Sequence, residues 1–287
     1  MNEQQNNITT AFESVDRILA PAEPARRTDG TSGDVATEAV PHVADLRNYS
    51  LDGLNIKGPV PLERIVQAVR RFRSGVCRPD VSHPRLNILL SGVPGSGKTA
   101  FVEYLAHTVG APLRTLGASD LLSKWIGETE KNLAKAFENA KRERAILFLD
   151  EVDSFLYDRS GAGHSWEVSS VNELLQQMEK FEGVMIGATN FLDRLDPAVL
   201  RRFTFKLQLD YLTDAGKRIF FDRYFHSPLS DEEGRRLDAI DRLAPGDFRT
   251  VCENLFYLYE NATNAERLSA LQAESAAKGK VQPPIGF

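Results

Sequence analysis

The fold of this chain is decided by residues 86–103, which read LNILLSGVPGSGKTAFVE. Residues 86–90 form a largely apolar run of the length of a buried strand. A glycine-rich turn follows, and the turn leads into a segment suited to a helix. The turn, residues 92–99, matches the pattern Gly-x-x-x-x-Gly-Lys-Thr and has on either side the strand and the helix that this pattern requires. The sequence therefore predicts a phosphate-binding loop.

The composition of this loop has a chemical reason. Backbone N–H groups surround phosphate oxygens only where side chains are absent, which explains Gly92, Gly95 and Gly97. The N-terminus of the following helix adds positive potential. We expect Lys98 to reach the β- and γ-phosphates and the Thr99 hydroxyl to hold Mg²⁺. The alternative is a glycine-rich turn that only links a strand to a helix. The predicted nucleotide-binding residues of the loop are Gly92, Val93, Pro94, Gly95, Ser96, Gly97, Lys98, Thr99 and Ala100.

A second motif follows residues 145–149, which read AILFL. A continuous apolar run, rather than an alternating one, is typical of a parallel strand that is buried on both faces. It ends in two acids. Asp150 is placed to hold the metal, directly or through water, and to take part in nucleotide binding, and Glu151 is placed to polarise an attacking water. The alternative is two solvated acids at the end of a strand.

Other predicted strands and helices alternate up to Leu212, and only helices follow it. The predicted strands are 86–90, 113–116, 145–149, 183–190 and 204–209. The predicted helices of this part are 61–69, 100–107, 127–142, 167–180 and a short one within 195–203. The later helices are 213–225, 230–239, 247–260 and 265–277, and we expect Gly246-Asp247 to cap the third of them. The fold class is therefore an α/β domain with a parallel five-stranded sheet flanked by helices, followed by a small all-α domain.

The bulk composition limits the classes of function. Of the 287 residues, 42% are hydrophobic and 26% charged, which is ordinary for a soluble globular chain. The net charge of −5 counts against a nucleic-acid partner, although a local patch or a partner protein leaves that route open. Cys77 and Cys252 form no C-x-x-C pair, so neither a disulfide framework nor a zinc site is expected. Neither a signal-peptide pattern nor an apolar run of about 18 residues is visible, so we expect a cytoplasmic protein with no membrane segment.

The order of the motifs resembles that of the AAA+ ATPases, and most closely the AAA subfamily of protein-remodelling ring ATPases. The resemblance covers about residues 50–275. It implies that residues 92–99 are the Walker A motif and that Asp150 and Glu151 are Walker B. It also implies that Asn190 is sensor 1, which orients the lytic water. Arg201 and Arg202 match the arginine fingers that reach the nucleotide site of a neighbouring subunit. The two arginines are adjacent in this chain, which leaves open which is the main finger.

The resemblance also implies loops that face the central pore of a ring. Lys124, Trp125 and Ile126 lie where the family carries its first pore loop, and residues 158–165 where it carries the second. Trp125 has two interpretations, a buried core anchor or an aromatic grip on an extended polypeptide. Arg249 imitates a sensor-2 arginine or is an inert residue on the surface of a helix.

The function that follows is an ATP-hydrolysing, Mg²⁺-dependent ring motor, a homo-oligomer and hexameric when active, that remodels, unfolds or disassembles a protein partner. The alternatives are a nucleic-acid motor or loader, and a nucleotide-gated scaffold that switches a partner. The expected parts are a disordered or recruiting N-terminal arm (1–45), in which Phe12–Leu19 has helical apolar spacing, the large ATPase domain (46–211), the helical lid (212–277) and a tail (278–287).

Overall fold

The computed structural model describes residues 50–75, 85–117, 128–154, 165–259 and 261–278. All of them belong to one of the two units into which the chain divides, residues 43–287. Within these ranges no helix is both long and apolar enough to cross a membrane. The expected N-terminal arm, the predicted first pore loop, residues 158–164 of the predicted second pore loop and residues 279–287 lie outside the described residues, and Ser165 is the first residue of α7.

The elements follow the predicted alternation. The strands are β1 (Asn55–Lys57), β2 (Leu86–Gly92), β3 (Leu113–Leu116), β4 (Ile146–Leu149), β5 (Val184–Thr189) and β6 (Phe205–Asp210). The helices before β6 are α3 (Leu62–Ser74), α4 (Lys98–Thr108), α6 (Glu128–Glu143), α7 (Ser165–Lys180) and α8 (Pro197–Leu200), with short 3₁₀ turns η1 (Val152–Ser154) and η3 (Leu192–Arg194). The helices after β6 are α9 (Asp214–Phe225), α10 (Asp231–Asp238), α11 (Pro245–Leu258) and α12 (Asn264–Lys278).

The strands form one six-stranded sheet in the order β1-β6-β2-β5-β4-β3. The five predicted strands are all present, and the pairs β6–β2, β2–β5, β5–β4 and β4–β3 are parallel. The sixth strand, β1, was not predicted and pairs antiparallel with β6. Its three residues are too few to show an alternating pattern. An ion pair between Lys57 Nζ and Asp210 Oδ2 at 2.6 Å and a hydrogen bond from Asn55 Nδ2 to the Tyr211 carbonyl at 2.7 Å hold it at the sheet edge.

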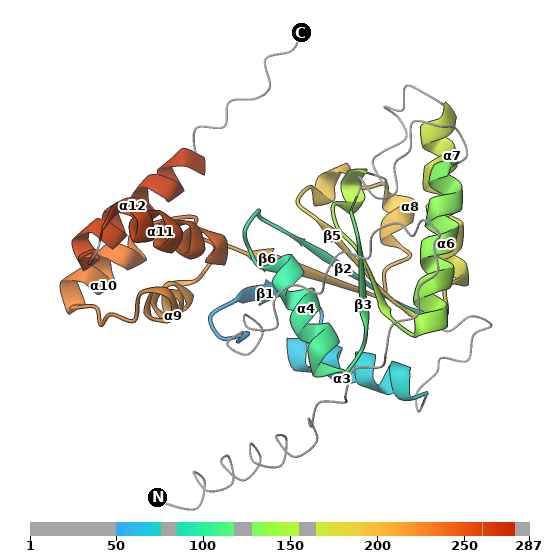
Figure 1. Ribbon diagram of the computed structural model, residues 1–287, viewed down its shortest axis with the longest axis horizontal. Helices are drawn as coiled ribbons and strands as arrows, with labels where there is room; N and C mark the ends of the chain where they lie inside the picture. Colours follow the sequence, from blue (N-terminus) through green and yellow to red (C-terminus); the bar gives the residue numbers. More distant parts are fainter. Residues whose placement is uncertain (1–49, 76–84, 118–127, 155–164, 260, 279–287) are drawn as a thin grey trace, which may run out of the picture. The chain divides into compact units, whose positions relative to one another are not determined.

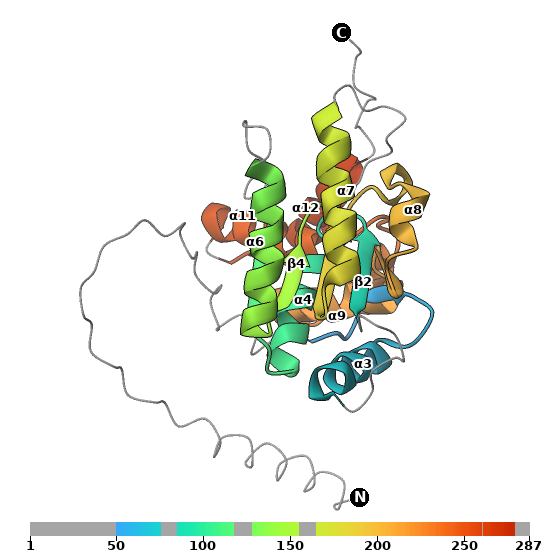
Figure 2. The same cartoon turned by 90° about the vertical axis from the view of Figure 1, so that its right-hand side faces the viewer.

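Helices cover both faces of the sheet, because its interior strands are apolar on both sides. In β4, Ile146 and Phe148 face the core cluster that includes α3 and α4. Leu147 and Leu149 face the cluster that includes α6 and α7. Figures 1 and 2 show α6 and α7 running side by side over one face. The predicted burial of this strand on both faces is confirmed, since all four side chains are fully buried.

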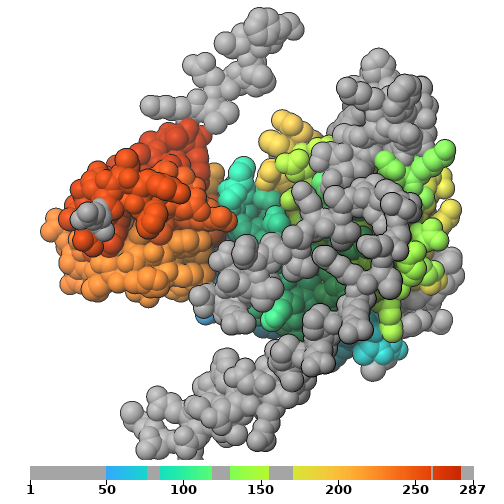
Figure 3. Space-filling model, in the orientation of Figure 1, coloured from blue at the N-terminus to red at the C-terminus, as the bar shows by residue number. Residues whose placement is uncertain are grey.

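The four last helices have a hydrophobic core of their own, which includes Phe221, Leu237, Phe248 and Leu271. Figure 3 shows these helices as a continuous group of orange and red atoms. The predicted cap of α11 is wrong in its position, since the N-cap residue is Ala244. Helix α11 starts earlier than expected because Pro245 occupies its first turn, where a missing N–H has no cost.

The topology brings the ends of three strands together. Strand β2 lies between β5 and β6, and β4 pairs with the far side of β5. Because these strands are parallel, their carboxyl ends lie on the same edge of the sheet, where ligands bind in open α/β sheets. The phosphate loop follows β2, Asp150 follows β4 and Asn190 follows β5, so the three predicted motifs meet at this edge.

Candidate active site

The phosphate loop begins with a glycine that no other residue can replace without a shift of the main chain. Gly92 has a φ of 151°, and a Cβ atom there would lie 2.0 Å from the Leu209 carbonyl oxygen of the neighbouring strand. The loop ends at Gly97, whose left-handed backbone precedes the first turn of α4. No side chain caps that turn, so the N–H groups of Lys98, Thr99 and Ala100 are available to an anion.

The Lys98 side chain lies inside the loop rather than in solvent. Its Nζ donates to the carbonyl oxygens of Gly92 and Val93 at 3.0 Å each and to Asn190 Oδ1 at 2.7 Å. Burial lowers the pKa of Lys98 below its usual value, and the negative charges of Asp150 and Asp153 oppose this shift. The ammonium group is thus held at the centre of the loop by acceptors that phosphate oxygens can replace. This arrangement fits the binding of a triphosphate.

Two oxygen ligands suited to Mg²⁺ lie beside the loop. The Thr99 hydroxyl, in the first turn of α4, is 3.3 Å from Asp150 Oδ2 at the end of β4. A hydroxyl and a carboxylate are the donors that Mg²⁺ takes from proteins when phosphate oxygens and water complete its shell. The donor set therefore fits the predicted metal, and these two residues would hold it.

Glu151 occupies an unusual main-chain conformation at the edge of the site. It has a φ of 53°, and its N–H donates to Asp150 Oδ1 at 3.0 Å. A left-handed conformation at a residue other than glycine costs about 1–2 kcal/mol, and such strain is often found at functional positions. The carboxylate of Glu151 is exposed, as the predicted polarisation of a water molecule requires.

The polar pair after β5 is divided between two partners. The Asn190 side chain accepts from Lys98, as described above, whereas the Thr189 hydroxyl donates to Asp153 Oδ1 at 2.6 Å and accepts from the Phe191 N–H at 2.9 Å. Sequence reasoning missed Asp153. Its position three residues after Asp150, one 3₁₀ turn further along η1, is the signal that could have found it. The Asp153–Thr189 bond ties the ends of β4 and β5 together.

The two adjacent arginines differ sharply in their contacts. Arg202 Nη2 forms an ion pair with Glu179 Oε1 at 2.8 Å, and Nη1 donates to the Ala198 carbonyl at 2.7 Å. The buried Asn87 side chain also donates to the Arg202 carbonyl at 3.0 Å. Arg201 is exposed, and its main-chain N–H donates to the Val199 carbonyl, but its side chain has no hydrogen bond or ion pair to any part of the chain that the structure describes. Of the two, only Arg201 has a guanidinium without a partner among the described residues.

The helical domain contributes a main-chain contact to the loop. The Gly246 N–H, in the first turn of α11, donates to the Gly95 carbonyl at 2.9 Å. Arg249, one turn further along α11, is exposed and pairs with Glu253 Oε1 at 2.8 Å. Its role as sensor 2 stays a prediction. Lys124, Trp125 and Ile126, the predicted first pore loop, lie outside the described residues.

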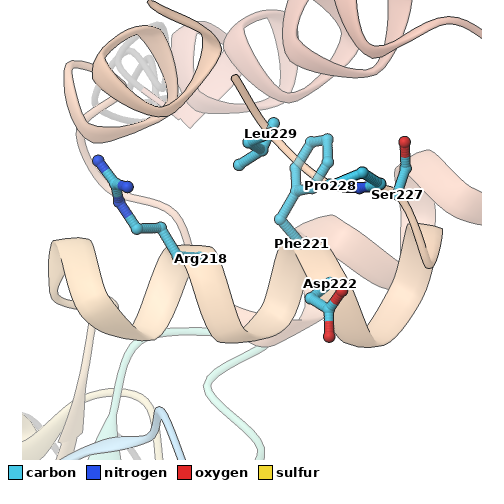
Figure 4. Close-up of a pocket in the computed structure, with 6 residues that line it drawn as sticks. All are labelled: Arg218, Phe221, Asp222, Ser227, Pro228 and Leu229. Carbon is cyan, nitrogen blue, oxygen red and sulfur yellow. The ribbon is translucent and has the colours of Figure 1, made fainter. Parts of the chain in front are cut away.

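The pockets that the structure shows in the helical domain are separate from this site. One, of about 160 Å³, is open and lies against α9, lined by Phe221 and Leu229 among others (Figure 4). Its arginine, Arg218, is paired with Asp238 at 2.6 Å. Its lining has no glycine loop and offers no unpaired positive charge to a phosphate group.

A parallel α/β sheet with this loop after an interior strand defines the class of P-loop nucleoside triphosphatases. A family model described as "ATPase family associated with various cellular activities (AAA)" matches residues 88–211. Residues 88–211 therefore form an AAA domain, an ATPase domain whose nucleotide is ATP and whose metal ion is Mg²⁺.

Several curated proteins are similar over the same region. Fidgetin-like protein 1 of Drosophila melanogaster is 32% identical over 206 residues, which is 67% of this chain and 38% of that protein. Spastin of Drosophila melanogaster is 33% identical over 200 residues, or 66% of this chain and 26% of spastin. The ATP-dependent zinc metalloprotease FtsH of Staphylococcus haemolyticus is 36% identical over 181 residues, or 58% and 24%. The chain thus spans well under half the length of these relatives.

Replacing Lys98 with alanine should weaken ATP binding itself. The variant loses a buried ammonium group that would donate to phosphate oxygens, and hydrogen bonds to charged groups contribute about 1.5–3 kcal/mol each, so affinity should fall by about tenfold or more. Calorimetric titration with ATP measures the change. The matched control is Lys135→Ala on the exposed side of α6. Unchanged ATP affinity in Lys98→Ala would contradict the placement of the phosphates in this loop.

Proposed function

We propose that this chain is a subunit of an ATP-driven homo-oligomeric ring, a hexamer when active, that remodels, unfolds or disassembles a protein partner. The observation that carries the proposal is the contrast between Arg201 and Arg202. The site holds residues for the phosphates, the metal and the water. Among the described contacts, however, no guanidinium of the same chain faces the phosphate loop. A copy of Arg201 from a neighbouring subunit would supply it.

Within one subunit, each group of the site has a distinct task. Lys98 and the first-turn N–H groups of α4 bind and orient the phosphates. Thr99 and Asp150 hold Mg²⁺, which when bound neutralises charge on the phosphate oxygens. Glu151 accepts a proton from the attacking water. Asn190, whose side chain accepts a hydrogen bond from Lys98 in this structure, orients that water. Asp153 keeps Asn190 in place through the hydroxyl of Thr189.

Hydrolysis in this scheme depends on assembly. Negative charge on the transferring phosphoryl group is compensated by an arginine, and such a group raises the rate by about 10³–10⁵-fold. The turn that carries Arg201 is fixed from its own chain by the bonds of Arg202, Asn87 and Glu179. This anchoring fixes the main chain at Arg201, so that its docking on a neighbour would cost little main-chain entropy.

A protein partner is the substrate class that the comparisons support. The relative FtsH is an ATP-dependent zinc metalloprotease, and proteins are the substrates of a protease. The net charge of −5 counts against a nucleic-acid partner. The grip on an extended polypeptide that we predict for Trp125, and the cytoplasmic location, stay predictions from the sequence.

The ATPase rate with different polymers tests the substrate class. An unfolded polypeptide such as reduced, carboxymethylated lactalbumin should raise the steady-state rate several-fold, and this stimulation should be lost in Trp125→Ala while the basal rate remains. Single-stranded DNA of comparable length is the control and should have no effect. Stimulation by DNA but not by polypeptide would favour a nucleic-acid motor, and no stimulation by either would favour a nucleotide-gated scaffold.

A further inference from the structure

The first turn of α11 has few amide groups to satisfy, and each has a defined partner. Pro245 has no N–H. The Asp247 N–H donates to the Ala244 carbonyl at 3.0 Å. The Asp247 carboxylate in turn accepts from the Ala244 N–H at 2.6 Å. Only the Gly246 N–H is directed away from the helix, and it donates to the Gly95 carbonyl of the phosphate loop.

The contact between Gly246 and Gly95 leaves little room for a side chain. A Cβ atom at Gly246 would lie 3.0 Å from the Gly95 Cα and 3.2 Å from its carbonyl oxygen, both main-chain atoms. Main-chain atoms cannot move aside as the end of a flexible side chain can. The position of this turn and the position of the phosphate loop are therefore coupled through their backbones.

A lysine at the C-terminal end of the helical domain contacts this turn. Lys278, the last residue of α12, lies with its Nζ 2.5 Å from Asp247 Oδ2 and 3.0 Å from the Arg242 carbonyl. The Nζ also lies 5.2 Å from the centroid of the Tyr211 ring, at the end of β6. Only 25% of the Lys278 side chain and 11% of the Asp247 side chain are exposed, so solvent screens this ion pair less than a surface pair.

These contacts form a continuous series from the end of α12 to the phosphate loop. Lys278 holds Asp247, Asp247 closes the first turn of α11, and Gly246 in that turn bonds to Gly95. We propose that Lys278 is a positioning residue for the nucleotide site, which acts through Asp247 and Gly246 on the phosphate loop. The inference rests on the proposed function, because the loop it positions is the one that would bind ATP.

The test compares Lys278→Met with the wild-type chain by two readouts. In the nucleotide-free protein, hydrogen exchange of the Gly246 amide should become about tenfold faster. The variant lacks the ion pair between Lys278 and Asp247, which contributes about as much as a hydrogen bond to a charged group, so the first turn of α11 should open more often. With N-methylanthraniloyl-ATP, the dissociation rate should rise about three- to tenfold, while the rate of hydrolysis at saturation changes by less than about twofold.

Three further variants separate positioning from general stability. Lys278→Arg keeps the charge and should restore the dissociation rate to near that of the wild type. Arg218→Met removes another ion pair of the same domain, with Asp238, and should leave the dissociation rate unchanged. In Gly246→Ala, the contact with Gly95 is already displaced, so adding Lys278→Met should cause no further rise in the dissociation rate.

Several results would overturn the inference. One is a Lys278→Met variant that melts earlier but releases the analogue at the wild-type rate. Another is an Arg218→Met variant with the same faster release, and a third is an additive effect in the Gly246→Ala background. A wild-type chain that binds no analogue would contradict the proposed function instead, and the exchange of the Gly246 amide would then decide the role of Lys278 by itself.

Discussion

Glu151→Gln should bind ATP with nearly the affinity of the wild type and hydrolyse it at least about a hundredfold more slowly. General bases contribute about 10²–10⁴-fold to a rate, and the substitution removes only the group that accepts the proton. Lys98, Thr99 and Asp150 remain in place, so binding should persist. The Glu151 side chain is exposed and both residues have the same shape, so the melting temperature should not change. Single-turnover hydrolysis and equilibrium binding of ATP measure the two effects separately.

The control for this prediction is Glu138→Gln, the same chemical change on the exposed face of α6. It should leave both binding and hydrolysis as in the wild type. A Glu151→Gln variant that turns over ATP at a near-normal rate would show that Glu151 is not the base. A variant that fails to bind ATP would place the residue in nucleotide binding instead.

Arg201→Ala and Arg202→Ala should fail in different ways. Removing Arg201 should lower the rate of hydrolysis about a thousandfold or more, with ATP binding and melting temperature unchanged, because its side chain has no partner among the described residues. Removing Arg202 breaks the ion pair with Glu179 and the bond to the Ala198 carbonyl. It should therefore lower the free energy of unfolding by about 1–3 kcal/mol. Steady-state ATPase assays and thermal melts of both variants measure these differences.

The second half of this prediction has its own control. Glu179→Gln removes the partner of Arg202 and leaves both arginines, so it should reproduce part of the loss of stability seen in Arg202→Ala. Equal loss of hydrolysis in the two arginine variants, with no change in melting temperature in either, would mean that both guanidinium groups act as fingers and that the anchoring contacts of Arg202 are incidental.

Much of the α/β domain could be predicted because its signals are local. The apolar run before Asp150 is continuous since β4 is covered on both faces, and the glycines of the phosphate loop have one main function that fits their spacing. Strand β3 was predicted with the bounds that the structure has. These features depend on the chemistry of consecutive residues, which a sequence displays directly.

The features that were missed depend on partners distant in the chain. β1 is a strand because Asn55 and Lys57 meet residues about 150 positions later and not because of its own pattern. The bond between Asp153 and Thr189 joins the ends of two strands. The start of α11 was misplaced because Asp247 has a side chain suited to an N-cap, whereas the structure uses it three positions inside the helix. The difference between Arg201 and Arg202 is likewise set by Glu179, on another helix.

A mixing experiment tests most directly whether the nucleotide site is completed by a neighbouring subunit. Arg201→Ala retains its nucleotide site but no finger, and Lys98→Ala retains its finger but no functional site. In an equal mixture, about a quarter of the interfaces in a randomly assembled ring would pair an intact site with an intact Arg201. We expect each variant alone to be inactive and the mixture to recover a corresponding fraction of wild-type hydrolysis. No recovery in mixed oligomers whose co-assembly has been shown by cross-linking of differently tagged chains would contradict a site completed in trans.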